Sequence, residues 1–304
     1  MKTMLCCAVL VWLAVASSAA QAAINVFACA PEWGSLVKEL AGARADVYVA
    51  TTATQDIHRI QARPSLIARA RTADLAVCTG ADLEIGWMPL VLTQSGNDKI
   101  QLGTTGYLEI ANYVRLIEVP TVIDRAMGDV HPRGNPHIQW GPRQVQLGAN
   151  EIARRLAEVD PAGSAEYQRR LADFTARWNA AMARWLQLGA PLKGVGIIQH
   201  HTNYSYLIEF LGMRLAGTLE PKPGVEPTSS HLNDLIQRQS NNPARLIVRS
   251  SYHSPAASEW LAERAKIPAI MLPATVGGTA GSGDLFSMYD EAIRRMLAAI
   301  GSSS

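Results

Sequence analysis

Residues 164–188 constrain the fold most strongly, because their apolar side chains recur at alternating intervals of four and three. This spacing places the side chains on one face of a helix, which Gly189 and Pro191 end. The apolar positions are Tyr167, Leu171, Phe174, Trp178, Ala181, Trp185 and Leu188. At 1.5 Å per residue the helix is roughly 37 Å long, about the diameter of a small domain. It is either a surface helix of one lobe or a bridge between two, and its mid-chain position favours a bridge.

Short apolar runs alternate with helical stretches on both sides of this helix, which predicts parallel sheets with helical crossovers. Before it, we expect strands at 24–29, 47–50, 75–78, 99–102 and 114–119, and helices at 33–40, 65–71 and 142–160. After it, we expect strands at 194–199, 246–249 and 269–272, and helices at 205–211, 231–239, 256–266 and 285–300. The predicted fold class is therefore α/β, with two similar lobes of parallel sheets flanked by helices. The predicted boundaries are 23–160 for the N-terminal lobe, 161–190 for the bridging helix and 191–304 for the C-terminal lobe.

Residues 1–22 read as a cleaved export signal. Lys2 precedes an apolar run at 5–16, and the small residues that follow offer the pattern that a signal peptidase cuts. The run is shorter than the ~20 residues of a membrane-spanning helix and no later stretch comes closer, so we expect no membrane span. The formal net charge of +2 falls by one without Lys2, which argues against nucleic acid or an anionic membrane as a partner. We expect a soluble exported protein.

Two cysteines, Cys29 and Cys78, remain after the signal is removed. Each follows an apolar run that we predict to be a strand. If these strands are neighbours, the two cysteines are close enough for a disulfide, which an oxidising compartment permits. The alternative is a pair of buried thiols.

Histidines and one acid follow the predicted strands at the points where these strands end. His58 and His137 lie in such loops of the first lobe, whereas His200, His201 and Asp284 lie in corresponding loops of the second. In open parallel sheets, functional groups gather beyond the carboxyl ends of the strands. If the lobes face each other, three imidazoles and a carboxylate converge in the cleft, a ligand set that suits Zn²⁺.

Five segments resemble the substrate-binding proteins of ABC transporters for zinc and manganese. These segments are Asp56-Ile-His58, Asn135-Pro-His-Ile-Gln-Trp140, His201-Thr-Asn-Tyr-Ser-Tyr206 with Phe210-Leu-Gly212, Pro221-Lys-Pro-Gly-Val-Glu-Pro227, and Leu272-Pro-Ala-Thr-Val-Gly-Gly278 with Asp284. The resemblance covers residues 24–300 and implies two α/β lobes joined by one rigid helix. It implies metal ligands at His58, His137, His201 and Asp284.

The resemblance also separates His201 from His200, because only His201 stands at the family's distance from the tyrosines that follow. Successive side chains of a strand point to opposite faces, so we expect only one of the two histidines to enter a given cleft position. Ile57 stands where the family usually has proline, which loosens the first loop slightly. Asp284 also reads as the N-cap of the helix after it, and capping would compete with ligation. The loop 128–134 is far shorter than the His-rich loop of many zinc-specific members, so His131 is at most an accessory to His137.

The resemblance implies a periplasmic receptor that captures Zn²⁺ between its lobes and delivers it to an ABC-type permease. A periplasmic metallochaperone is a further candidate partner, and we expect a monomer. Metal binding needs neutral imidazoles, so we expect affinity to fall below the histidine pKa of ~6.5. Residues 164–188 contain no Gly or Pro hinge, so we expect little lobe closure and release through the loops of His58 or His137.

Two alternatives remain beside the zinc receptor. The first is a Mn²⁺ receptor of the same family, which a second carboxylate in place of His201 would favour. The second is a secreted zinc hydrolase, which needs an open coordination position and a general base. Glu226 is the one acid that we can propose as that base, and it lies on a proline-rich loop.

Overall fold

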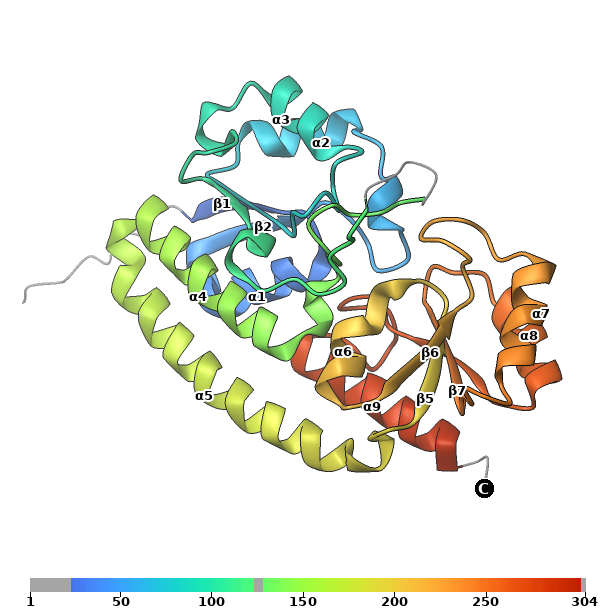
Figure 1. The fold of residues 1–304 in the computed structure, drawn as a ribbon. Helices are drawn as coiled ribbons and strands as arrows, with labels where there is room; N and C mark the ends of the chain where they lie inside the picture. The colour runs from blue at the N-terminus through green and yellow to red at the C-terminus, as the bar shows by residue number, and fades with distance from the viewer. Residues whose placement is uncertain (1–22, 123–127, 302–304) are drawn as a thin grey trace, which may run out of the picture.

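The computed structural model describes residues 23–122 and 128–301, so the predicted export signal at 1–22 lies outside the described residues. Two four-stranded sheets, both entirely parallel, form the framework (Figure 1). The first has the order β2-β1-β3-β4, built from β1 (Ile24–Ala28), β2 (Ala45–Val49), β3 (Leu75–Cys78) and β4 (Tyr107–Glu109). The second has the order β6-β5-β7-β8, built from β5 (Gly196–Gln199), β6 (Arg214–Thr218), β7 (Leu246–Ser250) and β8 (Ala269–Leu272). The predicted fold class is confirmed.

Helices cover both faces of each sheet (Figure 1). The first sheet lies between α1 (Pro31–Ala41) with α4 (Pro142–Val159) and α2 (Pro64–Arg71) with α3 (Met88–Ser95). The second lies between α6 (Ser205–Phe210) with α9 (Leu285–Gly301) and α7 (Ser229–Arg238) with α8 (Ala256–Ala265). Proline begins α1, α2 and α4, at a position where its missing N–H has no helical partner to lose. None of the helices in the described ranges has the length and hydropathy that a membrane span requires.

The long helix α5 (Ser164–Leu188) has the predicted bounds and runs from one lobe to the other (Figure 1). It packs on α1 and α4 of the first lobe and on α9 of the second. Trp178 donates its indole N–H to the carbonyl of Pro142 (2.8 Å), and Trp185 donates to Asp290 of α9 (2.6 Å). The apolar face ends one turn early, because Leu188 is 49% exposed.

One apolar core is continuous through both lobes. A single cluster of contacting buried side chains includes Leu36 of α1, Trp178 of α5 and Met288 of α9. At its centre, the ring of Tyr289 lies 5.3 Å from that of Trp140 and 4.5 Å from that of Trp185, measured between ring centroids. The two sheets are therefore held in one relative orientation by apolar packing rather than by a flexible linker.

Two predicted strands are wrong, and two observed strands were not predicted. The segment 98–100 is a 3₁₀ helix and 114–119 contains no strand, whereas β4 and β6 occupy edges of the two sheets. The edge strand β4 has only three residues, and β6 contains Gly217 where its register with β5 shifts. Short edge strands give weak alternation, and glycine often marks a bulge. The helix α3 was also missed.

The predicted disulfide is confirmed, because the structure joins Cys29 to Cys78. The strands β1 and β3 are hydrogen-bonded neighbours, and each cysteine lies at the carboxyl end of its strand. Their Cα atoms are 4.8 Å apart, within the range that a disulfide spans. Both side chains are fully buried, so the bond lies inside the first lobe.

Removal of the disulfide should destabilise the protein. The bond closes a loop across a sequence separation of 49, so the Cys29→Ala/Cys78→Ala variant should lose about 2–4 kcal/mol of unfolding free energy. Urea unfolding measures this loss. A reducing agent should lower the stability of the wild type but leave the variant unchanged. Equal unfolding midpoints for wild type and variant would contradict the prediction.

A buried carboxyl group links the two lobes. Glu32 of α1 is 2% exposed and accepts a hydrogen bond from the hydroxyl of Thr275, which follows β8 of the other lobe. Burial raises the pKa of Glu32 to about 7, and the hydrogen bond from Thr275 offsets part of this rise. The folded protein therefore holds a proton on Glu32 to higher pH than the unfolded chain does.

The titration of Glu32 should make the free energy of unfolding depend on pH. Because the pKa is raised on folding, its stabilising contribution is complete below the unfolded value of about 4.3 and is lost as pH rises through 7. The Glu32→Gln variant keeps an acceptor for Thr275 but cannot titrate. Between pH 5 and pH 8 it should lose about 2–3 kcal/mol less stability than the wild type in urea unfolding. The exposed Glu259→Gln variant is the control, and an unaltered pH profile for Glu32→Gln would refute the assignment.

Candidate metal centre

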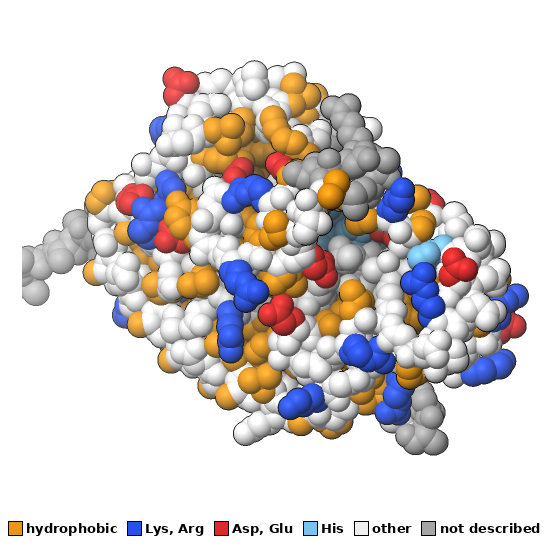
Figure 2. Space-filling model, in the orientation of Figure 1, with side chains coloured by type: hydrophobic (Ala, Val, Ile, Leu, Met, Phe, Trp, Pro, Cys, Tyr) orange, Lys and Arg blue, Asp and Glu red, His pale blue; other side chains and the backbone are white. Residues whose placement is uncertain are grey.

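Three of the predicted ligands meet between the lobes. His58 lies in a 3₁₀ helix (Ile57–Arg59) after β2, His137 directly precedes another (Ile138–Trp140), and His201 follows β5. One ring nitrogen of each histidine lies within 4.8 Å of the corresponding nitrogens of the other two. Histidine atoms are visible in a recess on the face shown in Figure 2. Loops of both lobes thus bring these three histidines together.

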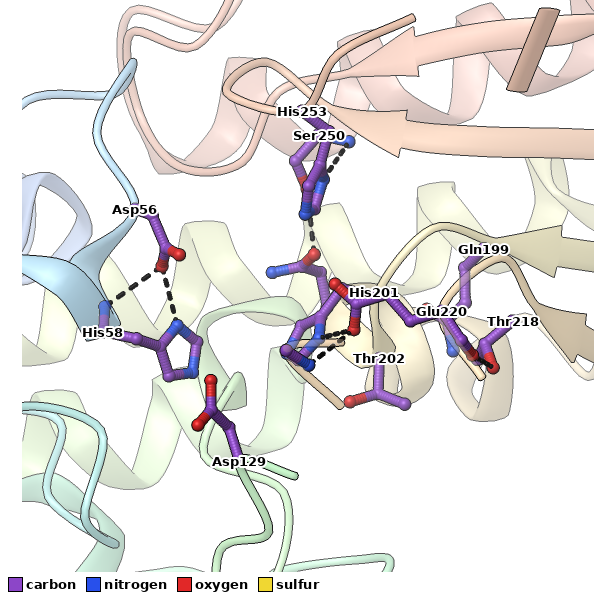
Figure 3. Close-up of polar contacts among 12 residues, drawn as sticks. Asp56, His58, Asp129, Gln199, His201, Thr202, Thr218, Glu220, Ser250 and His253 are labelled. Carbon is purple, nitrogen blue, oxygen red and sulfur yellow. Dashed lines mark hydrogen bonds and ion pairs between the residues drawn. The ribbon is translucent and has the colours of Figure 1, made fainter. Parts of the chain in front are cut away.

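Asp56 fixes the orientation of His58. One oxygen of its carboxylate, Oδ1, accepts hydrogen bonds from the backbone N–H of His58 (3.1 Å) and from the ring Nδ1 (2.8 Å), as Figure 3 shows. Burial favours a higher pKa for Asp56, but the hydrogen bonds and charge of His58 outweigh it and lower the pKa. An ionised carboxylate only accepts, so Nδ1 carries the proton and Nε2 is left with its lone pair.

Glu220 does the same for His201. Its Oε2 lies 2.7 Å from the Nδ1 of His201 and accepts the N–H of Gly224 at 2.9 Å (Figure 3). The Nε2 of His201 therefore faces the site. Glu220 was not identified from the sequence, because it follows the unpredicted strand β6. Its position directly before the proline-rich motif at 221–227 was the available signal.

His137 is the most buried of the three histidines, with 2% of its surface exposed. Its backbone N–H is held by the side chain of Asn135 (2.8 Å), and its Nε2 lies 3.1 Å from the Nε2 of His201. Burial, and secondarily the charges of nearby histidines such as His201, lower the pKa of His137 well below its usual value. His137 is therefore neutral at neutral pH, which is the form that binds a metal.

His131 lies closer to the centre than the sequence indicated. Its Nδ1 donates to the carbonyl of Ala81 (3.1 Å), and its Nε2 lies 3.3 Å from the Nε2 of His58. Burial is the main cause that lowers the pKa of His131 to about 4. Metal–nitrogen bonds of 2.0–2.1 Å in a tetrahedral site imply nitrogen–nitrogen edges of roughly 3.3 Å. The His131–His58 and His137–His201 spacings both match such an edge.

Asp284 is not brought to the histidines. Its side chain is exposed and caps α9, because Oδ1 accepts the backbone N–H of Ser287 at 2.7 Å while Ser287 bonds back to the N–H of Asp284 at 2.9 Å. Neither Asp284 nor His131 belongs to the group of three histidines, but His131 lies 3.3 Å from one of them. Capping engages Oδ1, one of the two carboxylate oxygens, and holds the side chain at the start of α9.

The remaining polar residues of the sequence analysis lie around the site. Glu226 is exposed and lines a pocket of about 210 Å³ together with His58 and His201. His231 bonds the carbonyl of Thr218 (2.8 Å) and supports the start of α7. His200, the neighbour of His201, lines the same pocket as Glu226 but does not belong to the first group of histidines.

The family model and the curated proteins that match this chain are described as zinc-uptake proteins. A family described as zinc-uptake complex component A, periplasmic, matches residues 26–300. High-affinity zinc uptake system proteins ZnuA are among the relatives: that of Yersinia pestis is 20% identical, covering 68% of this chain and 69% of that protein. That of Haemophilus ducreyi is 24% identical over 42% of this chain, and the chain spans only 41% of its length.

Solved structures agree in fold. A crystal structure of ZnuA superposes with a TM-score of 0.77 at 22% identity, covering 91% of this chain and 99% of the other. A Mn-bound periplasmic metal-binding protein from Candidatus Liberibacter asiaticus has a TM-score of 0.74 at 15% identity, with the same coverage. The family match covers nearly the whole described chain and confirms the family predicted from the sequence. The protein belongs to the family of periplasmic A components of zinc-uptake complexes.

Proposed function

We propose that the protein captures Zn²⁺ between its lobes and delivers it to an ABC-type permease for uptake. The observation that carries the proposal is the convergence of His58, His137 and His201, with a carboxylate behind two of the rings. Carboxylate–histidine pairs fix the tautomer of a ligating ring and raise its basicity. The arrangement therefore presents imidazole lone pairs to one point before any metal arrives.

Imidazole donors favour zinc over manganese. The three convergent groups are all nitrogen ligands, whereas Mn²⁺ prefers carboxylate, carbonyl and water oxygens. Relatives of the same fold have been solved with Mn and with Cd, so the fold alone does not select the metal. We assign Zn²⁺ on the donor set, and Mn²⁺ remains the alternative cargo.

The fourth ligand position has two candidates. The Nε2 of His131 lies 3.3 Å from the Nε2 of His58, the spacing of two ligands in a tetrahedral zinc site. Its Nδ1–H already donates to the backbone carbonyl of Ala81. Asp284 would have to leave its cap on α9. We assign the position to His131, and the sequence-based assignment of Asp284 stays a prediction that the experiment below tests.

Delivery follows from the arrangement of the lobes. We assign residues 23–160 and 191–304 to the two lobes and 161–190 to the bridge. The core continues across this bridge, so a large hinge motion would expose apolar surface, and we propose that the loops that carry His58 or His137 move instead. Release on the permease, with or without a metallochaperone that loads the site, therefore proceeds through these loops. We propose a monomer that acts as a receptor rather than an enzyme, after export by a cleaved signal.

The Zn²⁺ affinities of single-substitution variants should distinguish ligating residues from residues that do not bind the metal. His58→Ala, His137→Ala and His201→Ala should each weaken Zn²⁺ binding by more than about 100-fold, and Glu220→Gln by about 10–100-fold, the range for groups that orient a ligand. Competition against a chromophoric chelator measures the affinity. His231→Ala is the matched control, since this histidine bonds a backbone carbonyl of the same lobe. Wild-type affinity in the folded His137→Ala variant would refute the proposed site.

The fourth position can be tested by one pair of variants. His131→Ala should lower Zn²⁺ affinity, whereas Asp284→Ala should leave affinity unchanged and reduce stability by about 1 kcal/mol through the lost helix cap. Chelator competition and urea unfolding on both variants give the answer. The reverse pattern, with affinity lost only in Asp284→Ala, would restore the assignment made from the sequence.

A further inference from the structure

A second group of metal-ligating side chains lies on the other side of Glu220. His200 follows β5 beside His201, and His253 lies in the turn after β7. One ligand atom from each of His200, Glu220 and His253 lies within 4.8 Å of the other two. Glu220 is thus shared by two groups of histidines.

His200 has a buried ring nitrogen without a hydrogen-bond partner among the described residues. The residue is 5% exposed, and its Nδ1 is buried with no hydrogen-bond partner in the described part of the chain. A buried unsatisfied polar atom costs roughly 1–3 kcal/mol. The ring stacks on that of His253, with centroids 3.9 Å apart and planes inclined by 12°. Stacking buries the ring but gives its nitrogen nothing to bond, so the atom is available to a ligand.

The surrounding pocket suits a cation. It has a volume of about 210 Å³ and is lined by His200 and His253, and by His58 and His201 of the first group. Four acidic residues also line it: Asp56, Asp129, Glu220 and Glu226. Arg59 lines it too but lies 3.7 Å from Asp129, so part of its charge is compensated. The lining therefore carries more acidic than basic side chains.

We propose that His200, His253 and Glu220 form a second site for a divalent cation of the Zn²⁺ class, beside the site of His137 and His201. The inference rests on the proposed function only in taking Zn²⁺ as the cation that reaches the pocket. Two imidazoles and a carboxylate are a familiar zinc ligand set that leaves one position for water. A carboxylate offers about four lone-pair sites, of which Oε2 of Glu220 uses two for His201 and Gly224.

The second site should be weaker than the first. Glu220 already accepts hydrogen bonds from His201 and Gly224, and His253 must exchange a hydrogen bond of its own on binding. Its Nδ1 accepts only a long bond from the N–H of Ser250, 3.4 Å, which costs little to exchange. Two dications that share Glu220 also repel each other, so the second ion binds after the first.

Metal stoichiometry tests the proposal. Equilibrium dialysis of the whole mature protein against increasing Zn²⁺, with metal analysis, should give one tight equivalent and a second, weaker one. Titration with Co²⁺ should show two successive changes in visible absorption. His253→Ala and His200→Ala should each lose the weaker equivalent and keep the tight one. His231→Ala should keep both, and His137→Ala should weaken the tight equivalent while the other persists.

The outcomes distinguish this inference from the proposed function. A single tight equivalent in the wild type, or a second equivalent that survives in both His200→Ala and His253→Ala, would overturn the second site and leave the first intact. Loss of the tight equivalent from the wild type would instead overturn the proposed function. His253 lies on a partly exposed turn, so its variant tests the site even if His200→Ala fails to fold.

Discussion

The contact that the rest of the structure depends on is the packing of α5 and α9 against aromatic side chains from both lobes. Trp178 and Trp185 of α5 contact Tyr289 of α9, and Tyr289 in turn donates its hydroxyl proton to the carbonyl of Gln139 (2.7 Å). This last bond ties the C-terminal helix to the residue that follows His137 and Ile138. The same apolar cluster that joins the lobes therefore sets the position of a candidate ligand, and the carboxyl edges of the two sheets face each other because the core allows one orientation.

Loops attached to this frame carry the candidate histidines, and a carboxylate orients two of the three rings. Asp56 is two residues from His58, so a local 3₁₀ turn suffices to orient that ring. Glu220 reaches His201 from the end of a neighbouring strand. The first pairing is local and the second depends on sheet pairing, yet both leave an Nε2 lone pair directed into the site. Orientation of the rings is thus built into each lobe separately, while their meeting depends on the core.

Much of the fold could be predicted from the sequence, and the failures have physical causes. The bounds of α5 were predicted correctly, because its amphipathic pattern extends over many turns. The edge strand β6 was missed because it contains Gly217 and has an irregular register, and the position of Glu220 beside His201 was missed with it. The three convergent histidines follow strands that the pattern did reveal or match a family motif. The choice between His131 and Asp284 depends on distances between loops, which no local pattern records.

The site has a further property that follows from the positions of its histidines along the chain. His137 and His201 are separated by 64 residues, and His58 comes from a loop still nearer the N-terminus. In an unfolded chain such separations leave the three rings at low effective concentration with respect to one another, and no pair can act as a local chelate. The three rings therefore come together only after both sheets have formed. The proposed affinity for zinc depends on the completed folding of both lobes, and a partly folded chain lacks it.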